Sequence, residues 1–131
     1  MAFYIGGPVQ RPGTKLPKWI YECYTIISKT TNAMPPSVER QLETLEPSLF
    51  NREIHRRIYE SEGVVAVFLP GDESTPVECA IAAMLGKRVL LIAAESESVP
   101  RVLSGMKGVR LARFGPNIEN EIRLFRLRSD L

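Results

Sequence analysis

A run of six apolar residues at positions 64–69, Val-Val-Ala-Val-Phe-Leu, restricts the fold of this chain more than any other feature. The run is rich in β-branched residues and has no polar residue at alternate positions, which is typical of a strand buried on both faces. A second strand of this kind is predicted at residues 87–93. Because such strands occur in parallel sheets covered by helices on both sides, the sequence predicts an α/β fold.

Segments with helical periodicity alternate with the predicted strands. Apolar residues recur at intervals of three and four in segments near residues 17–28, 47–62, 76–85 and 118–125. A short helix is expected at residues 99–103, and further strands at 2–5 and 109–114. This alternation predicts a three-layer, doubly wound parallel sheet of about five strands, of the flavodoxin or Rossmann type, in a single domain spanning residues 1–131.

The segment from residue 29 to residue 48 is harder to interpret. Paired threonines and paired prolines in it are expected to break regular structure. A second strand is placed either near residues 26–30 or near residues 33–34, and a short helix at residues 37–45. The sequence does not decide between the two positions of the strand.

The composition is that of a small globular protein. The 131 residues are 44% hydrophobic and 24% charged, with a net charge of +2, which excludes a disordered chain and does not imply nucleic-acid binding. The apolar runs are far shorter than a membrane span, and the first residues lack a signal-peptide pattern, so a cytoplasmic location is expected. Cys23 and Cys79 are expected to be buried free thiols, and no Cys/His cluster has metal-ligand spacing. No metal and no cofactor is predicted.

The predicted C-terminal helix has two contrasting faces. Its apolar face is formed by Ile118, Ile122 and Phe125 and is a candidate subunit interface. The other face carries three arginines, which are interpreted as solvated groups that complement the helix dipole: Arg123, Arg126 and Arg128. A structural subunit that docks through this helix is therefore one hypothesis for the function.

A ligand site is expected at the carboxyl ends of the strands, where the strand order of such sheets reverses. The first loop leaving such an end covers residues 6–13. Gly6 and Gly7 let the backbone approach a ligand closely, and Arg11 could hold an anionic group. The loop matches neither a dinucleotide-binding fingerprint nor a phosphate-binding P-loop, so a tight turn that requires glycine remains the alternative interpretation.

The second such loop covers residues 70–78. Thr75, Pro76 and Glu78 fit an N-terminal capping box of the following helix, which is a complete structural explanation. However, three carboxylates within seven residues (Asp72, Glu73 and Glu78) are more than a cap requires. The helix N-terminus is expected to favour the ionised form of Glu78, and an ionised carboxylate there can attack a sugar carbon.

The motifs of these two loops resemble those of the nucleoside 2-deoxyribosyltransferase family. Residues 3–8, Phe-Tyr-Ile-Gly-Gly-Pro, are similar to the opening motif of the family, a hydrophobic residue followed by Tyr-Leu-Ala-Gly-Pro. Residues 72–82 are similar to its motif Asp-x-Gly-Thr-x-x-Glu-x-Gly-x-Ala, with Ser74 and Ile81 in place of the two glycines. The family includes short 2′-deoxynucleoside 5′-phosphate N-hydrolases. The resemblance therefore implies cleavage of an N-glycosidic bond, by hydrolysis or by base transfer.

The resemblance also implies roles for individual residues. Glu78 matches the nucleophile that forms a covalent glycosyl ester, and Asp72 matches an acidic residue near the sugar or base. The residues implied in substrate binding are Tyr4, Gly6 and Gly7 in the sugar and base pocket, and Ser74 and Thr75 at sugar hydroxyls or a 5′-phosphate. His55 stands where the family usually has a sugar-binding Asp, and could protonate a leaving base.

Two alternatives stay open. Residues 69–78 also resemble a loop of the nucleotide phosphoribohydrolases once labelled lysine decarboxylases, in which Pro70, Gly71, Thr75 and Glu78 match the motif. The loss of motif glycines also allows a domain that binds or senses a nucleotide without cleaving it. A small-molecule nucleoside or nucleotide is the expected ligand in each case, and a homodimer or larger homo-oligomer is the expected assembly.

Overall fold

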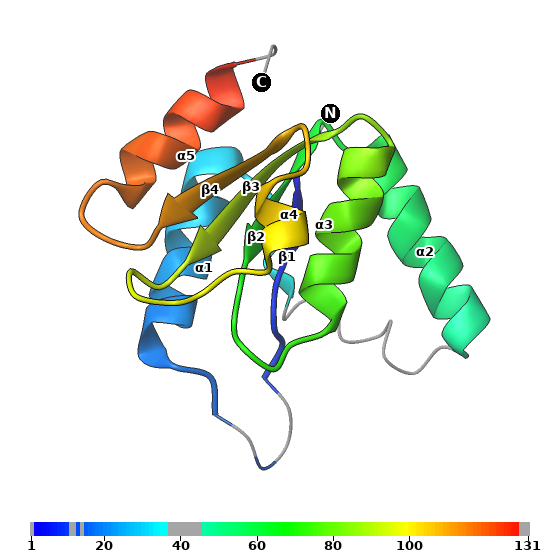
Figure 1. Ribbon diagram of the computed structural model, residues 1–131, viewed down its shortest axis with the longest axis horizontal. Coiled ribbons are helices and arrows are strands. Elements are labelled where there is room, and N and C mark those ends of the chain that lie inside the picture. Colours follow the sequence, from blue (N-terminus) through cyan, green and yellow to red (C-terminus); the bar gives the residue numbers. More distant parts are fainter. Residues whose placement is uncertain (1, 11–12, 14, 37–45, 129–131) are drawn as a thin grey trace.

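The computed structural model of this protein describes residues 2–10, 13, 15–36 and 46–128 (Figure 1). Four strands and five helices occur within these ranges. In chain order they are β1 (Tyr4–Gly6), α1 (Lys18–Thr31), α2 (Pro47–Glu60), β2 (Gly63–Val67), α3 (Ser74–Met84), β3 (Arg88–Ala93), α4 (Arg101–Ser104), β4 (Val109–Arg113) and α5 (Ile118–Leu127).

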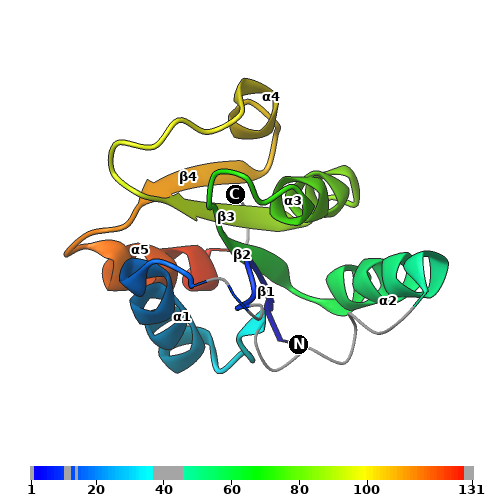
Figure 2. The ribbon, with the colours of Figure 1, turned by 90° about the horizontal axis from the view of Figure 1, so that it is seen from below.

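The strands form one parallel sheet. Their order is β1-β2-β3-β4, with Tyr4 opposite Val64 and Val65 opposite Leu90. Helices α1 and α5 cover one face, and α2, α3 and α4 cover the other (Figure 2). The predicted three-layer α/β fold with a parallel sheet is confirmed, with four strands in the described ranges where about five were expected. Among these strands the order runs without reversal, so the carboxyl-end edge itself, rather than a reversal point, holds the candidate site.

The side chains of β2 alternate between two apolar cores. Val65 and Val67 belong to the core beneath α1 and α5, whereas Val64 and Ala66 belong to the core beneath α2 and α3. All five residues of the strand are buried. Because both faces of the sheet are covered, β2 has no solvent face that would require polar residues, which explains the unbroken apolar run in the sequence.

Helix α1 extends further than the sequence predicted. Residues 26–30 are helical rather than a strand, and residues 33–34 form no strand either. The hydroxyls of Thr30 and Thr31 each donate a 2.7 Å hydrogen bond to a carbonyl oxygen one turn earlier, so the threonines stay within the helix. The helix ends at Asn32, which adopts a left-handed conformation (φ 60°). The short helix expected at residues 37–45 lies outside the described residues.

Helix α5 packs inward, against the expectation that its apolar face is a subunit interface. Ile118, Ile122 and Phe125 are at most 2% exposed and lie in the core beneath α1 and α5. Two arginines form hydrogen bonds between α5 and neighbouring elements. Nη1 of Arg126 donates to the carbonyl oxygen of Thr30 at 3.0 Å, and Arg88 donates to the carbonyl oxygen of Phe125. Arg126 therefore completes the end of α1 instead of being only a solvated group.

Candidate active site

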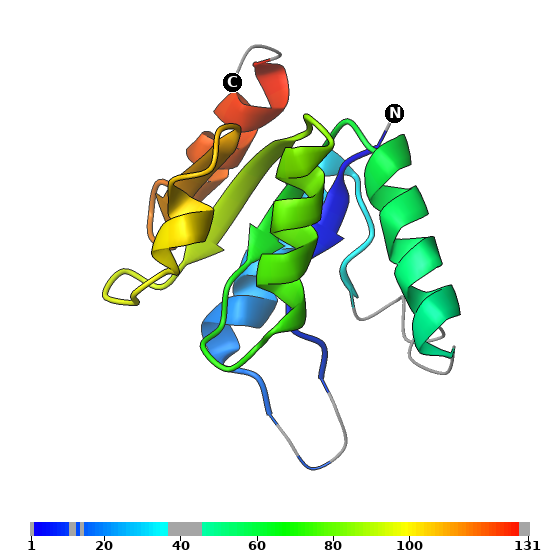
Figure 3. The same ribbon diagram turned by 45° about the vertical axis from the view of Figure 1, so that its right-hand side comes forward.

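Strand β1 and helix α3 lie close together (Figure 3). Tyr4, the first residue of β1, meets Glu78, which lies about one turn into α3. The hydroxyl of Tyr4 donates a hydrogen bond to Oε1 of Glu78 at 2.6 Å. Gly6 follows Tyr4 on the same face of the strand, and a Cβ atom placed on Gly6 would lie 3.6 Å from that oxygen. The structure therefore unites residues from both loops that the sequence singled out.

Asp72 organises the start of α3. Its Oδ1 accepts a hydrogen bond from the backbone N–H of Ser74 at 3.1 Å, and its Oδ2 accepts one from the hydroxyl of Thr75. Thr75 is fully buried, whereas Ser74 is exposed. An aspartate that bonds to backbone two residues ahead is a common turn-forming and helix-starting element.

The predicted capping box is wrong. The helix begins at Ser74, two residues before the expected first residue Pro76, and Glu73 is the N-cap residue. Asp72 supplies the acceptor for the first helical N–H, so neither Thr75 nor Glu78 is needed as a cap. The Glu78 carboxylate accepts the hydrogen bond of Tyr4 instead of capping the helix.

Burial controls the ionisation of Glu78. Loss of water raises its pKa from about 4.5 to about 7, the charge of Asp72 adds to the rise, and the hydrogen bond from Tyr4 opposes it. The helix N-terminus was expected to favour the ionised form of Glu78, but the net shift of its pKa is upward, and desolvation by burial is its largest cause. A carboxyl with a pKa near neutrality at a strand edge is a common feature of functional sites.

Tyr24 of α1 is a residue of this region that the sequence analysis missed. It is 6% exposed, and its hydroxyl donates a 2.7 Å hydrogen bond to the carbonyl oxygen of Pro8. Gly7, which precedes Pro8, has φ of 149°, and a Cβ atom placed on it would overlap the Tyr24 hydroxyl. The available signal was a phenol on the apolar face of an amphipathic helix, since buried tyrosine hydroxyls usually find a partner.

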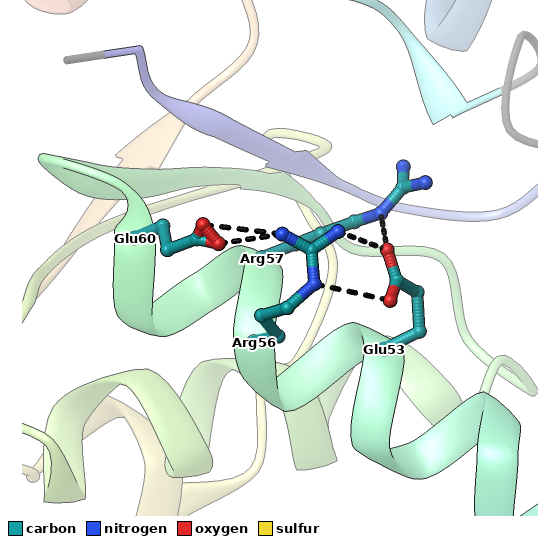
Figure 4. Close-up of polar contacts among 4 residues, drawn as sticks. All are labelled: Glu53, Arg56, Arg57 and Glu60. Atoms are coloured by element: carbon teal, nitrogen blue, oxygen red, sulfur yellow. Dashed lines mark hydrogen bonds and ion pairs between the residues drawn. The ribbon is translucent and has the colours of Figure 1, made fainter.

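Helix α2 contributes no hydrogen bond to the Tyr4–Glu78 pair in the part of the chain that the structure describes. His55 is exposed. On an adjoining side of the helix, Glu53 bonds to both Arg56 (3.1 Å) and Arg57 (3.0 Å), and Arg56 also bonds to Glu60 (Figure 4). These partners lower the pKa of Glu53 to about 2. The carboxylates of α2 are thus committed to arginines of the same helix.

The remaining predicted residues have separate outcomes. Gly71 is exposed with φ of 92°, a turn position that favours glycine, and Arg11 lies outside the described residues. Cys23 and Cys79 are buried free thiols, and burial raises the pKa of each to about 12.

Within the described ranges no group of three His, Cys, Asp or Glu side chains could hold a metal ion. In the same ranges, no helix combines the length and apolar character that a membrane span requires.

The raised pKa of Glu78 predicts a specific dependence of stability on pH. The unfolded chain releases this proton near pH 4.5 and the folded protein near pH 7, so the folded state binds the extra proton between these values. The free energy of unfolding should therefore fall by about 2–3 kcal/mol from this group as the pH rises from 4.5 to 7.

Urea unfolding at a series of pH values measures this effect. Glu78→Gln should lack that decrease, whereas Glu73→Gln, at an exposed carboxyl of the same loop, should retain it. Equal pH dependence of wild type and Glu78→Gln would contradict the burial argument.

Comparisons with known proteins show which solved structure has a similar fold. No family model and no curated protein matches the chain. Among solved structures, the CMP N-glycosidase BcmB of Clostridium botulinum is similar, with a TM-score of 0.57 and 16% sequence identity. The match covers 95% of this chain and 99% of that chain. At this identity the comparison establishes a shared fold over nearly the whole length of both proteins.

Proposed function

We propose that this protein cleaves the N-glycosidic bond of a nucleoside or nucleoside 5′-monophosphate, with the Glu78 carboxylate as nucleophile. The observation that carries the proposal is the largely buried Glu78 carboxyl, held by the Tyr4 hydroxyl at 2.6 Å and facing Gly6. Gly6 leaves open the space that a Cβ atom would otherwise fill. The backbone of β1 therefore lies close to the carboxylate, with no side chain between them at this position.

The reaction has two steps. A carboxylate oxygen of Glu78 attacks the anomeric carbon, and the bond between that carbon and the base nitrogen breaks, with its electron pair leaving on the base. The base takes up a proton from solvent. Water then attacks the same carbon, the ester bond to Glu78 breaks with its electron pair returning to the carboxylate, and the attacking water loses a proton to solvent as the sugar is released. A second base in place of water gives transfer.

Three independent observations support this proposal. The motifs around Tyr4 and Glu78 are similar to those of a family with this chemistry. The fold is shared with a protein whose name states that it is a CMP N-glycosidase. The pKa of Glu78, near 7, leaves a substantial ionised fraction at neutral pH. Each of them favours glycosidic cleavage over a purely structural role.

Asp72 acts on this site indirectly. Both of its oxygens accept hydrogen bonds from the start of α3, and its charge raises the pKa of Glu78. The same bonds engage Ser74 and Thr75, which were expected to bind a 5′-phosphate. We therefore assign Asp72 to positioning of the helix.

Release of free base tests the proposed reaction. Wild type should release base from at least one member of a panel of ribo- and deoxyribonucleosides and their 5′-monophosphates, read by liquid chromatography. Glu78→Gln should reduce the rate by roughly 10³-fold or more, because the nucleophile is lost, while Glu73→Gln should stay near wild type. Base release that survives in Glu78→Gln would exclude Glu78 as the nucleophile. Tight nucleotide binding without release would instead favour a sensor.

The pH dependence of the rate tests the Tyr4–Glu78 bond. The ionised carboxylate is the reactive form, so the rate should rise with pH through about 7. Tyr4→Phe removes a donor that stabilises the carboxylate, and the midpoint should move upward by about 1–2 pH units. A downward or absent shift, measured over pH 5 to 10, would contradict this arrangement.

A homodimer is part of the proposal, through a surface other than α5. Val77 and Met84 lie seven residues apart on α3 and are 57% and 80% exposed, and Val102 on neighbouring α4 is 82% exposed. No charged residue occurs on α3 except Glu78. Sedimentation should show a wild-type dimer and a monomeric Val77→Glu/Met84→Glu variant. A wild-type monomer at all accessible concentrations would rule the dimer out.

A further inference from the structure

We propose that Tyr24 is a positioning residue that fixes the turn after β1, residues 7–8, and through it the end of β1 next to the Glu78 carboxylate. This inference rests on the proposed function and names a further residue on which the reaction depends. Tyr24 comes from α1 on the opposite face of the sheet from α3. Its hydrogen bond therefore connects the turn after β1 to the core beneath α1 and α5.

The first contact is a buried hydrogen bond. The Tyr24 hydroxyl donates to the carbonyl oxygen of Pro8 at 2.7 Å, and both residues are buried. The ring lies in the apolar core with Ile20, Cys23 and Ile27 of the same helix. A phenol held by core packing offers a rigid donor, so the carbonyl of Pro8 is fixed relative to the sheet.

The second contact is steric and involves Gly7. Its φ of 149° and the overlap of an added Cβ atom with the Tyr24 hydroxyl leave glycine as the residue that fits. The ring carbon Cζ would lie 3.1 Å from that Cβ atom. Tyr24 thus fixes the turn in two ways, through a bond to Pro8 and through close packing against the backbone of Gly7.

The position of this turn determines the space in front of the Glu78 carboxylate. Gly6 adjoins Gly7, and its missing Cβ atom faces Oε1 of Glu78 at 3.6 Å. A shift of this backbone by about 1 Å would change the distance over which Glu78 reaches a bound sugar. Displacements of that size can cost about 100-fold in rate when reacting atoms must lie in line.

The phenol of Tyr24 also stays protonated while Glu78 titrates. Burial raises its pKa, and the charges of Asp72 and Glu78 raise it further. Its bond to Pro8 is therefore the same on both sides of pH 7. In this respect Tyr24 differs from Tyr4, whose bond changes the ionisation of Glu78 itself.

Kinetics of Tyr24→Phe test the inference, with the rate expressed per folded molecule by circular dichroism. The variant should lower kcat about 10- to 100-fold and leave the pH midpoint of the rate at the wild-type value. Tyr59→Phe, at a 63% exposed tyrosine of α2, is the matched control and should keep wild-type kcat. Wild-type kcat per folded molecule in Tyr24→Phe, even with a lowered melting temperature, would show a role in stability only and overturn the inference.

Gly7→Ala supplies a second, independent approach to the same contact. It should also lower kcat, and it should cost less in the Tyr24→Phe background because the overlapping hydroxyl is then absent. If Tyr24→Phe does not fold, Gly7→Ala decides alone, and an unchanged kcat overturns the inference. Absence of base release from wild type would contradict the proposed function itself, whereas release that both variants leave unchanged would contradict only the role of Tyr24.

Discussion

The Glu78 carboxyl loses most of its water and receives one strong hydrogen bond in return, from Tyr4 at 2.6 Å. One neutral donor does not offset the desolvation of a carboxylate, so the proton is held up to about pH 7. Burial of the ionised carboxylate lowers the stability of the fold. It also makes the group more reactive, because a poorly solvated carboxylate is a stronger nucleophile than a hydrated one. The elements around the site are arranged to maintain this balance.

Each neighbouring element removes a competing use of the carboxylate. Asp72 accepts the hydrogen bonds at the start of α3, so Glu78 is not consumed as a cap. Gly6 keeps the adjacent surface of β1 free of a side chain. A small parallel sheet with buried strands holds these parts in register, because both of its faces are packed against helices.

Much of this architecture could be predicted from the pattern of apolar residues. The unbroken run at residues 64–69 requires cover on both faces, and that requirement alone leads to a parallel sheet between two helical layers. The loops at the strand ends then follow, and with them Gly6 and Glu78, whereas Tyr4 was indicated only by the resemblance to a known family. The features that could not be predicted depend on which of several nearby groups a side chain hydrogen-bonds to. The sequence favoured Thr75 as the cap of α3, whereas in the structure Asp72 accepts the hydrogen bonds at the start of that helix. Thr30 and Thr31 looked like helix breakers, yet their hydroxyls find carbonyl oxygens within α1. Tyr24 lies on a helix face that the apolar periodicity predicted to be buried, and that pattern did not indicate a hydrogen bond to the turn after β1.

The most direct test of the central claim is to trap the covalent intermediate on Glu78. A nucleoside or monophosphate with fluorine at the 2′ carbon destabilises the positive charge that develops in both steps, so the ester accumulates. Intact-protein mass spectrometry after mixing should show an added mass equal to the sugar without its base, and peptide mapping should place it on Glu78. Base release without any adduct, or an adduct on another residue that survives in Glu78→Gln, would contradict the assignment of Glu78 as nucleophile.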